Sequence, residues 1–331
     1  MLIRSANLTQ PSFVYPKDWG QGRRGLWAGG RDSYTDCADT IDYITISTPA
    51  NSTKFGDTTI THLWGVSGTS GRGRGFISGG VHNQTVTNQI LYITISVPGN
   101  ATTFGVLPYT RWQCDSASNG TRALILSGRS GGINPAGPWE STVDYITIST
   151  TGNATTFGNY SGSRTSQSHG AVGDGNYCIA MSQNHPSQFF FDYWTIDTLS
   201  DSTKWGEWRA GGLTGEGMQA CSSGSRGVWG GAYSGSELTK MDYLTFSTQG
   251  NALQFGELRI SMFYGEGCGD GSRGVFGGGT GWGSGSGHAD LEYFNINGSP
   301  GTAVVSANFG NLGGMNQTNH KRGDCAGFAG D

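Results

Sequence analysis

The chain has 331 residues, a formal net charge of −4 and only 13% charged residues, while glycine occupies 58 positions. Basic residues are scarce and never form a run of four, which argues against a nucleic-acid groove held by phosphate contacts. No apolar segment approaches the length of a membrane-spanning helix, so we expect no membrane span, and the absence of a Gly-X-Y period excludes collagen.

The N-terminal segment, residues 1–7, lacks the basic start and the long apolar stretch of a signal peptide. We therefore do not expect export by the general secretory route. If the protein works outside a cell, it must arrive there by another path, such as release on a particle by lysis.

The six cysteines contain no CxxC pair, and their spacing does not match a zinc site. We expect them to be small buried apolar side chains, because free cysteine is often buried in this way. Disulfide bonds are the alternative interpretation.

In chain order, six short alternating apolar segments recur at nearly constant intervals of about 50 residues, and each contains a Tyr. These are Tyr43, Tyr92, Tyr145, Tyr193, Tyr243 and Tyr293. An aromatic residue followed by Gly comes at one fixed interval after the first five and at a longer interval after the last: Phe55, Phe104, Phe157, Trp205, Phe255 and Phe309. A repeat of this length built from short strands predicts an all-β, kelch-like β-propeller forming one domain over residues 1–331.

The unit at residues 218–258 shows the repeat most fully and predicts four short strands, at 218–222, 226–231, 241–247 and 253–258. Short turns join the first strand to the second and the third to the fourth, and a variable loop joins the second to the third, so we expect an antiparallel meander, which is one blade. One such sheet cannot bury both of its faces alone, so the copies must stack against one another.

Two charged positions recur with the repeat. An Arg opens the second strand of five units, at Arg24, Arg74, Arg122, Arg226 and Arg273. A carboxylate precedes the repeat Tyr in five units, at Asp42, Asp144, Asp192, Asp242 and Glu292. This periodic placement indicates a structural role, and we hypothesise that each carboxylate pairs with the Arg that opens the second strand.

The two ends of the chain resemble parts of one further unit. Residues 315–317 and 321–330 resemble a first and second strand, and residues 2–8 resemble a fourth strand. Joining the ends in one sheet would remove open sheet edges. The sequence therefore predicts seven blades, the last one short, with six blades as the alternative.

Nine Asn-x-Ser/Thr sequences occur, several of them in repeated turns such as 99–102 and 152–155. Gly and Asn suit positions where the chain reverses. We therefore interpret most of these asparagines as turn residues rather than glycan acceptors.

Three blocks carry a resemblance to a known family: Arg273–Gly279, Val143–Thr150 and Gly152–Gly158. They are similar to the kelch-type repeats of bacteriophage virion proteins, especially those of marine and cyanobacterial phages, and the similarity covers nearly the whole chain. The resemblance implies a structural or adhesive component of a tail, fibre, neck or other appendage. The fourth unit departs from the pattern at 176–181 and 189–191.

Motifs for catalysis are weak. The six histidines fall in different loops with no HxH or HxxxH spacing, so we expect no metal site, and we expect no cofactor. Glycine-rich runs such as 277–283 precede no helix and lack Lys, unlike phosphate-binding loops. The sequence therefore favours a protein that is not an enzyme.

The better binding candidates lie in the variable connections, which we assign to the loops between second and third strands. Aromatic and polar side chains on a rigid scaffold suit contact with glycan or protein. The candidate residues are Trp139 and Glu140 in 131–141, Arg164 and His169 in 159–175, and Trp282 and His288 in 280–290.

Three functions follow from these observations. The leading hypothesis is a non-catalytic virion structural or appendage protein that docks to other virion proteins through its loops. The alternative is a receptor-binding adhesin that recognises host surface glycan. A glycan-active enzyme is the third.

Overall fold

The computed structural model describes residues 22–31, 37–61, 63–134, 136–166, 170–184, 188–213, 215–279, 289–301, 303, 305–313 and 325–330. Within these residues the regular structure consists of β-strands and one 3₁₀ turn at Ser161–Ser163. The described part of the chain has no helix long and apolar enough to cross a membrane.

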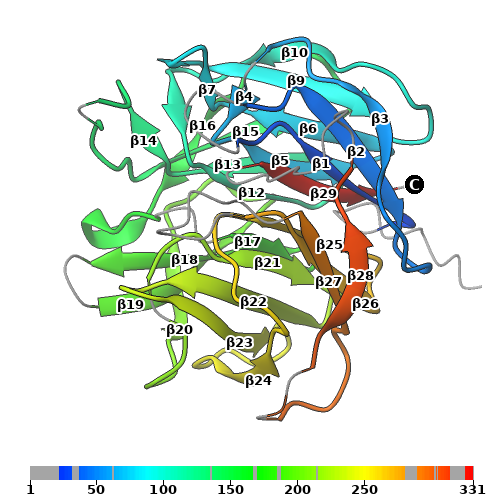
Figure 1. The fold of residues 1–331 in the computed structure, drawn as a ribbon. Helices are drawn as coiled ribbons and strands as arrows, with labels where there is room; N and C mark the ends of the chain where they lie inside the picture. Colours follow the sequence, from blue (N-terminus) through cyan, green and yellow to red (C-terminus); the bar gives the residue numbers. More distant parts are fainter. Residues whose placement is uncertain are drawn as a thin grey trace, which may run out of the picture.

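The described strands form six four-stranded antiparallel sheets, numbered here in chain order, and their strands are given from the inner to the outer edge (Figure 1). The first sheet contains β29 (Ala326–Gly330), β1 (Arg24–Ala28), β2 (Thr40–Thr45) and β3 (Thr53–Asp57). The second contains β5 (Ser67–Gly71), β6 (Arg74–Ser78), β9 (Gln89–Thr94) and β10 (Thr102–Val106). The third contains β12 (Asp115–Ser118), β13 (Arg122–Leu126), β15 (Thr142–Thr147) and β16 (Thr155–Asn159).

The other three sheets follow the same order. The fourth contains β17 (Ala171–Gly173), β18 (Tyr177–Asn184), β19 (Gln188–Thr195) and β20 (Thr203–Glu207). The fifth contains β21 (Gln219–Ser222), β22 (Arg226–Tyr233), β23 (Glu237–Thr245) and β24 (Leu253–Glu257). The sixth contains β25 (Glu266–Gly269), β26 (Arg273–Gly277), β27 (Asp290–Asn295) and β28 (Ala307–Asn311). This all-β arrangement is compatible with a β-propeller-like fold.

Two small accessory sheets lie in the connections of the second and third sheets. One contains β4 (Leu63–Trp64), β7 (Val81–His82) and β8 (Thr85–Val86), and the other contains β11 (Arg111–Trp112) and β14 (Arg129–Ser130). In Figure 1, β7, β14 and the hairpin end of β18 and β19 lie toward the left side. We call the surface formed there by these connections the loop face.

The C-terminal strand corrects one prediction. Residues 326–330 were expected in a seventh unit, but β29 pairs antiparallel with β1 and is the innermost strand of the first sheet, with Leu26 opposite Phe328. Figure 1 shows the two strands side by side. The described residues thus contain six four-stranded sheets, while the expected contributions of 2–8 and 315–317 lie outside the described residues.

The repeat Tyr and the aromatic residue that follows it pack edge to face in every sheet. Their ring centroids are 5.3 to 6.0 Å apart, in the pairs Tyr43–Phe55, Tyr92–Phe104, Tyr145–Phe157, Tyr193–Trp205, Tyr243–Phe255 and Tyr293–Phe309. Edge-to-face geometry is favoured by the ring quadrupoles. The constant spacing in the sequence therefore reflects one packing unit that joins the third and fourth strands.

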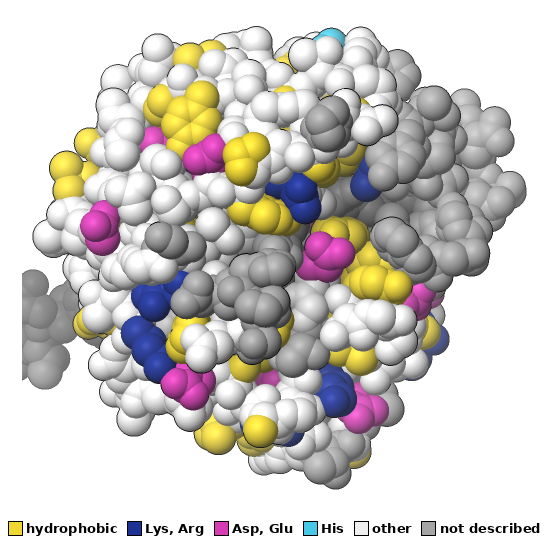
Figure 2. All heavy atoms as spheres, turned by 90° about the vertical axis from the view of Figure 1, so that its left-hand side faces the viewer, with side chains coloured by type: hydrophobic (Ala, Val, Ile, Leu, Met, Phe, Trp, Pro, Cys, Tyr) yellow, Lys and Arg dark blue, Asp and Glu magenta, His cyan; other side chains and the backbone are white. Residues whose placement is uncertain are grey.

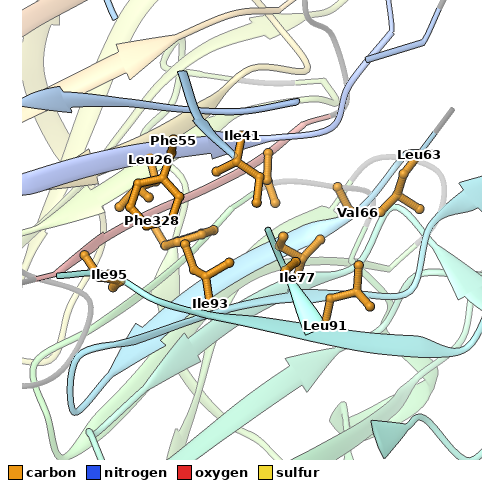
Figure 3. Close-up of a cluster of buried hydrophobic side chains, with 13 residues drawn as sticks. Leu26, Ile41, Phe55, Leu63, Val66, Ile77, Leu91, Ile93, Ile95 and Phe328 are labelled. Atoms are coloured by element: carbon orange, nitrogen blue, oxygen red, sulfur yellow. The ribbon is translucent and has the colours of Figure 1, made fainter. Parts of the chain in front are cut away.

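Apolar side chains from neighbouring sheets interdigitate. Figure 3 shows one such cluster, in which Leu26, Phe55 and Phe328 from the first sheet meet Ile77 and Ile93 from the second. All five are at most 4% exposed. Burial of this kind, at about 25 cal/mol per Å² of apolar surface, is the main force that holds one sheet against the next.

Backbone hydrogen bonds also join the outer strand of each sheet to the following sheet. The amide of Ala101 donates to the carbonyl of Asp57 at 2.9 Å, and the last sheet is tied to the first by Ser52, whose amide donates to Asn311 at 2.9 Å. The equivalent donors elsewhere are Ala154, Ser202, Ala252 and Val305, with acceptors Val106, Asn159, Glu207 and Glu257. These bonds satisfy part of each outer edge and leave less of it open to pairing with another chain.

Three Asn-x-Ser/Thr asparagines take part in these junctions. The Oδ1 atoms of Asn51, Asn100 and Asn153 accept hydrogen bonds from backbone amides of the preceding sheet at 3.0 to 3.2 Å. Their amide side chains therefore act as structural links between turns and strands, as expected for turn residues.

Candidate binding face

The innermost strands of the six sheets meet around a narrow central cavity of about 60 Å³. It is lined mainly by small residues, among them Gly68, Ser116, Ala171, Gly267 and Gly327. A cavity of this size holds a few water molecules, whereas sites for small organic ligands are several times larger. Ligand recognition is therefore better served by the loop face.

Glycine is required where the inner strands approach each other. A Cβ atom on Gly68 would lie 2.6 Å from the carbonyl oxygen of Gly327, and one on Gly267 would lie 2.3 Å from the carbonyl oxygen of Ala220. Both distances are below normal van der Waals contact, so larger residues would push the sheets apart. The glycines thus set how narrow the centre is.

The arginines that open the second strands connect neighbouring sheets. Arg24, Arg74, Arg122, Arg226 and Arg273 donate from Nη1 to the carbonyls of Ile95, Ile148, Ile196, Ile296 and Ile46, at 2.6 to 3.3 Å. Each guanidinium also lies over the repeat Tyr of its own sheet, with 4.5 to 5.3 Å between the carbon and the ring centroid. In the fourth sheet Tyr177 takes this position and packs against Tyr193 instead.

The hypothesis that these arginines bind the repeat carboxylates is wrong for four of the five carboxylates. Four of the carboxylates pair instead with an Arg from the connection that enters their own sheet: Arg111–Asp144, Arg164–Asp192 at 2.7 Å, Arg209–Asp242 at 2.9 Å, and Arg259–Glu292 at 2.8 Å. All four carboxylate side chains are fully buried. Each pair fastens an entering connection to the third strand, which supports a structural role for the carboxylates.

Burial raises the pKa of one of these carboxyl groups, that of Asp192. Removal from water raises the pKa of its carboxyl group, while hydrogen bonds from Ser182 and Arg164 and the charge of Arg164 act in the opposite direction. The Arg164 guanidinium binds both carboxylate oxygens, at 2.8 and 2.7 Å. This bidentate geometry is the strongest form of an Arg–carboxylate pair.

The structure describes three of the six candidate binding residues. His169, Trp282 and His288 lie outside the described residues. Arg164 lies in the connection between β16 and β17, and not in a loop between second and third strands, so that part of the assignment is wrong. Its side chain is committed to Asp192 and is only 16% exposed.

Trp139 and Glu140 do lie in a connection between a second and a third strand, and both are half-buried. Trp139 bridges to Arg129 of β14. The Oε1 atom of Glu140 accepts a hydrogen bond from the Ser130 hydroxyl, and its carbonyl accepts one from Ser127 at 2.6 Å. The two residues therefore belong to one ordered hairpin on the loop face.

Next to this hairpin lies a cluster of aromatic and basic side chains that the sequence analysis does not predict. The Arg129 guanidinium carbon lies 4.3 Å from the Trp139 ring centroid and 5.9 Å from that of Trp112. Trp112 packs edge to face on Trp64 at 5.4 Å, and Arg31 lies over Trp64 at 3.8 Å. The interval between Trp64 and Trp112 matches the length of the repeat, and this regular spacing is the feature of the sequence that could have revealed the cluster.

Figure 2 views the molecule from the side on which β14 and the β18–β19 hairpin lie. Most of the visible described surface belongs to neutral polar groups, with separate hydrophobic and charged side chains. Such a surface suits polar ligands or proteins more than an extended polyanion.

None of the six cysteines is in a disulfide bond, and five of them are buried. Burial raises the pKa of the Cys114 thiol to about 12, and it also raises the pKa values of Cys178, Cys221 and Cys268. A raised pKa leaves little thiolate for reaction. Among the described residues no group of three or more His, Cys, Asp and Glu side chains could hold a metal ion.

A comparison with models of protein families finds no match, and a comparison with curated proteins finds no significantly similar sequence.

Proposed function

We propose that the chain folds as a six-bladed, kelch-like β-propeller whose blades are the six four-stranded sheets. The proposal is supported by contacts between successive inner strands, which run from β29 through β5, β12, β17, β21 and β25 and return to β29. The bonds from Ser52 to Asn311 and from Arg273 to Ile46 link the sixth sheet to the first. The C-terminal strand β29, paired with β1, completes the first sheet and so joins the start and the end of such a wheel.

We further propose that this propeller is a non-catalytic structural or appendage component of a bacteriophage virion. It is made in the host cytoplasm and docks to other virion proteins through its loop face. The phage origin rests on the resemblance of the repeats. The observation that carries the structural role is that the repeated carboxylates Asp144, Asp192, Asp242 and Glu292 are buried in ion pairs that fasten the scaffold.

The experiment that tests this proposal is quantitative mass spectrometry of purified particles, combined with gold labelling of the chain. We expect several copies per particle at one defined location. Absence from washed, infectious particles of the source phage would overturn the proposal. Disrupted particles fractionated into heads and tails would identify the neighbouring subunits.

The second candidate function is a receptor-binding adhesin for host surface glycan. The observation that favours it is the Arg129, Trp112 and Trp139 cluster, which offers aromatic rings and a guanidinium on the loop face. Purified protein that binds host cells or their lipopolysaccharide would favour this function over docking alone. The two functions are compatible, because an appendage protein can carry an adhesive site.

A further inference from the structure

Arg129 differs from four other arginines of the connections between strands, because it forms no ion pair among the described residues. Arg111, Arg164, Arg209 and Arg259 each have a carboxylate partner. The side chain of Arg129 makes one hydrogen bond among the described residues, from Nη1 to the carbonyl of Gly137 at 3.3 Å, and forms no ion pair there. Its buried Nε atom has no hydrogen-bond partner. This half-buried cation thus has no ion-pair partner among the described residues.

Both tryptophan rings lie close to this guanidinium. Trp139 and Trp112 lie within 6 Å of the guanidinium carbon, the range for cation–π contact. Nη1 already donates to Gly137 and Nε is buried, so Nη2 is the nitrogen that can donate to an anion. Nη2 has no hydrogen bond among the described residues, so it remains available for a ligand oxygen.

The rest of the hairpin supplies groups that suit a sugar. Trp139 and Glu140 are half-buried and therefore partly open to solvent. Glu140 is held in place by Ser130, and a carboxylate fixed in this way can accept hydrogen bonds from hydroxyl groups. An aromatic ring provides an apolar surface for the C–H face of a sugar ring, as in ligand sites that combine apolar walls with a few polar groups.

We propose that Arg129, Trp139 and Glu140 form a subsite for an acidic sugar that carries a carboxylate. The guanidinium binds the sugar carboxylate through Nη2, Trp139 packs against the sugar ring, and Glu140 accepts a hydrogen bond from a sugar hydroxyl. The sugar carboxylate supplies the ion-pair partner that Arg129 lacks among the described residues. This inference rests on the loop face being a contact surface, and it names the class of glycan for the adhesive function.

The test measures binding of the purified full chain to an oligogalacturonate by isothermal titration calorimetry. The matched ligand is the same oligosaccharide with its carboxyl groups reduced to alcohols. The variants are Arg129→Gln, Arg129→Lys and Trp139→Ala. Lys204→Gln, which removes one exposed positive charge from β20, is the control. Thermal melts accompany every variant to establish that it is folded.

We expect the wild type to bind the acidic oligosaccharide and to lose affinity as salt is raised. The reduced oligosaccharide and Arg129→Gln should each weaken binding by at least about tenfold. Arg129→Lys should retain part of the affinity, because it keeps the charge but lacks the planar fork. Trp139→Ala should weaken binding to the acidic form, and Lys204→Gln should leave it unchanged.

The proposal is overturned if the wild type binds neither oligosaccharide, if it binds both equally, or if a folded Arg129→Gln protein binds as well as the wild type. If Arg129→Gln fails to fold, Arg129→Lys and Trp139→Ala decide the question. None of these results affects detection of the chain in particles, so the failure of this inference and of the virion role can be told apart.

Discussion

Arg273 of the sixth sheet donates a hydrogen bond to the carbonyl of Ile46 in the first sheet at 2.8 Å, across 227 residues of sequence. The same guanidinium lies 4.6 Å from the ring centroid of Tyr293 in its own sheet. One side chain therefore joins the packing of its own sheet to the backbone of the next. Arg24 of the first sheet makes the same hydrogen bond to the carbonyl of Ile95 in the second sheet. The sixth sheet is therefore joined to the first by the same contact that joins the first sheet to the second.

Replacing Gly68 by Ala should destabilise the protein. The added Cβ would lie 2.6 Å from the carbonyl oxygen of Gly327 in the neighbouring inner strand, so the backbone must shift. We expect a loss of about 1–3 kcal/mol in the free energy of unfolding, measured by urea denaturation. Gly152→Ala is the control, since nothing lies within 4 Å of its Cβ position. Equal stability of the two variants would show that the inner strands are not this close.

Removing one partner of the Arg111–Asp144 pair should cost more than removing both. Both side chains are fully buried, so Arg111→Met leaves an uncompensated carboxylate. We expect a loss of about 3–5 kcal/mol for the single variant and a smaller loss for Arg111→Met combined with Asp144→Leu. Chemical denaturation of the four proteins of this double-mutant cycle measures the coupling. Additive losses would contradict a direct pair.

Asp192 should make a distinct contribution to the dependence of stability on pH. Its pKa is raised in the folded state, so the folded protein holds this proton more tightly than the unfolded chain does. The contribution of Asp192 is therefore fully present below the unfolded pKa and is lost as the pH rises through the folded pKa. The stability of the wild type relative to Asp192→Asn should fall as the pH is raised from about 3.8.

Denaturation at a series of pH values measures this difference directly. Taking the difference from Asp192→Asn removes the contributions of other groups. A wild type that gains stability relative to Asp192→Asn over the same interval would mean that the Arg164 charge outweighs desolvation, and that the pKa is lowered instead.

Thiol labelling should distinguish the folded protein from the unfolded one. Cys114, with a pKa of about 12, and the other buried thiols should resist a disulfide reagent at neutral pH for as long as the fold persists. In denaturant all six cysteines should react without prior reduction, because none is in a disulfide bond. Fewer than six reactive thiols in denaturant would indicate a disulfide.

The strands and their aromatic pairs could be predicted from the sequence because both are local. The spacing from Tyr43 to Phe55 spans two adjacent strands and one turn, so the periodic pattern contains the contact. The partner of Asp144 could not be found in this way. Arg111 lies much earlier in the chain, in a connection outside the repeated motif, and the same is true of Arg164, the partner of Asp192.

Two other features also depend on contacts that a local pattern does not contain. Residues 321–330 resemble a second strand in the sequence, and only the pairing of β29 with β1 shows that 326–330 form the first strand of the first sheet. Arg129 and Trp139 come together through a hairpin, while Trp112 reaches them from the preceding connection. Sequence reasoning found Trp139 as an aromatic loop residue, but not the cation beside it.

An engineered disulfide between the sixth and first sheets tests closure of the wheel most directly. The Gly313 amide donates to the Ser52 hydroxyl at 2.6 Å, and a Cβ on Gly313 would lie 3.8 Å from that oxygen. Ser52→Cys combined with Gly313→Cys should therefore form an intrachain bond on oxidation, seen as faster migration on a non-reducing gel and by peptide mapping. The pair Ser52→Cys and Gly250→Cys, in turns of different sheets, should not. A closed six-sheet wheel predicts this result, whereas intermolecular dimers alone, or no bond, would contradict it.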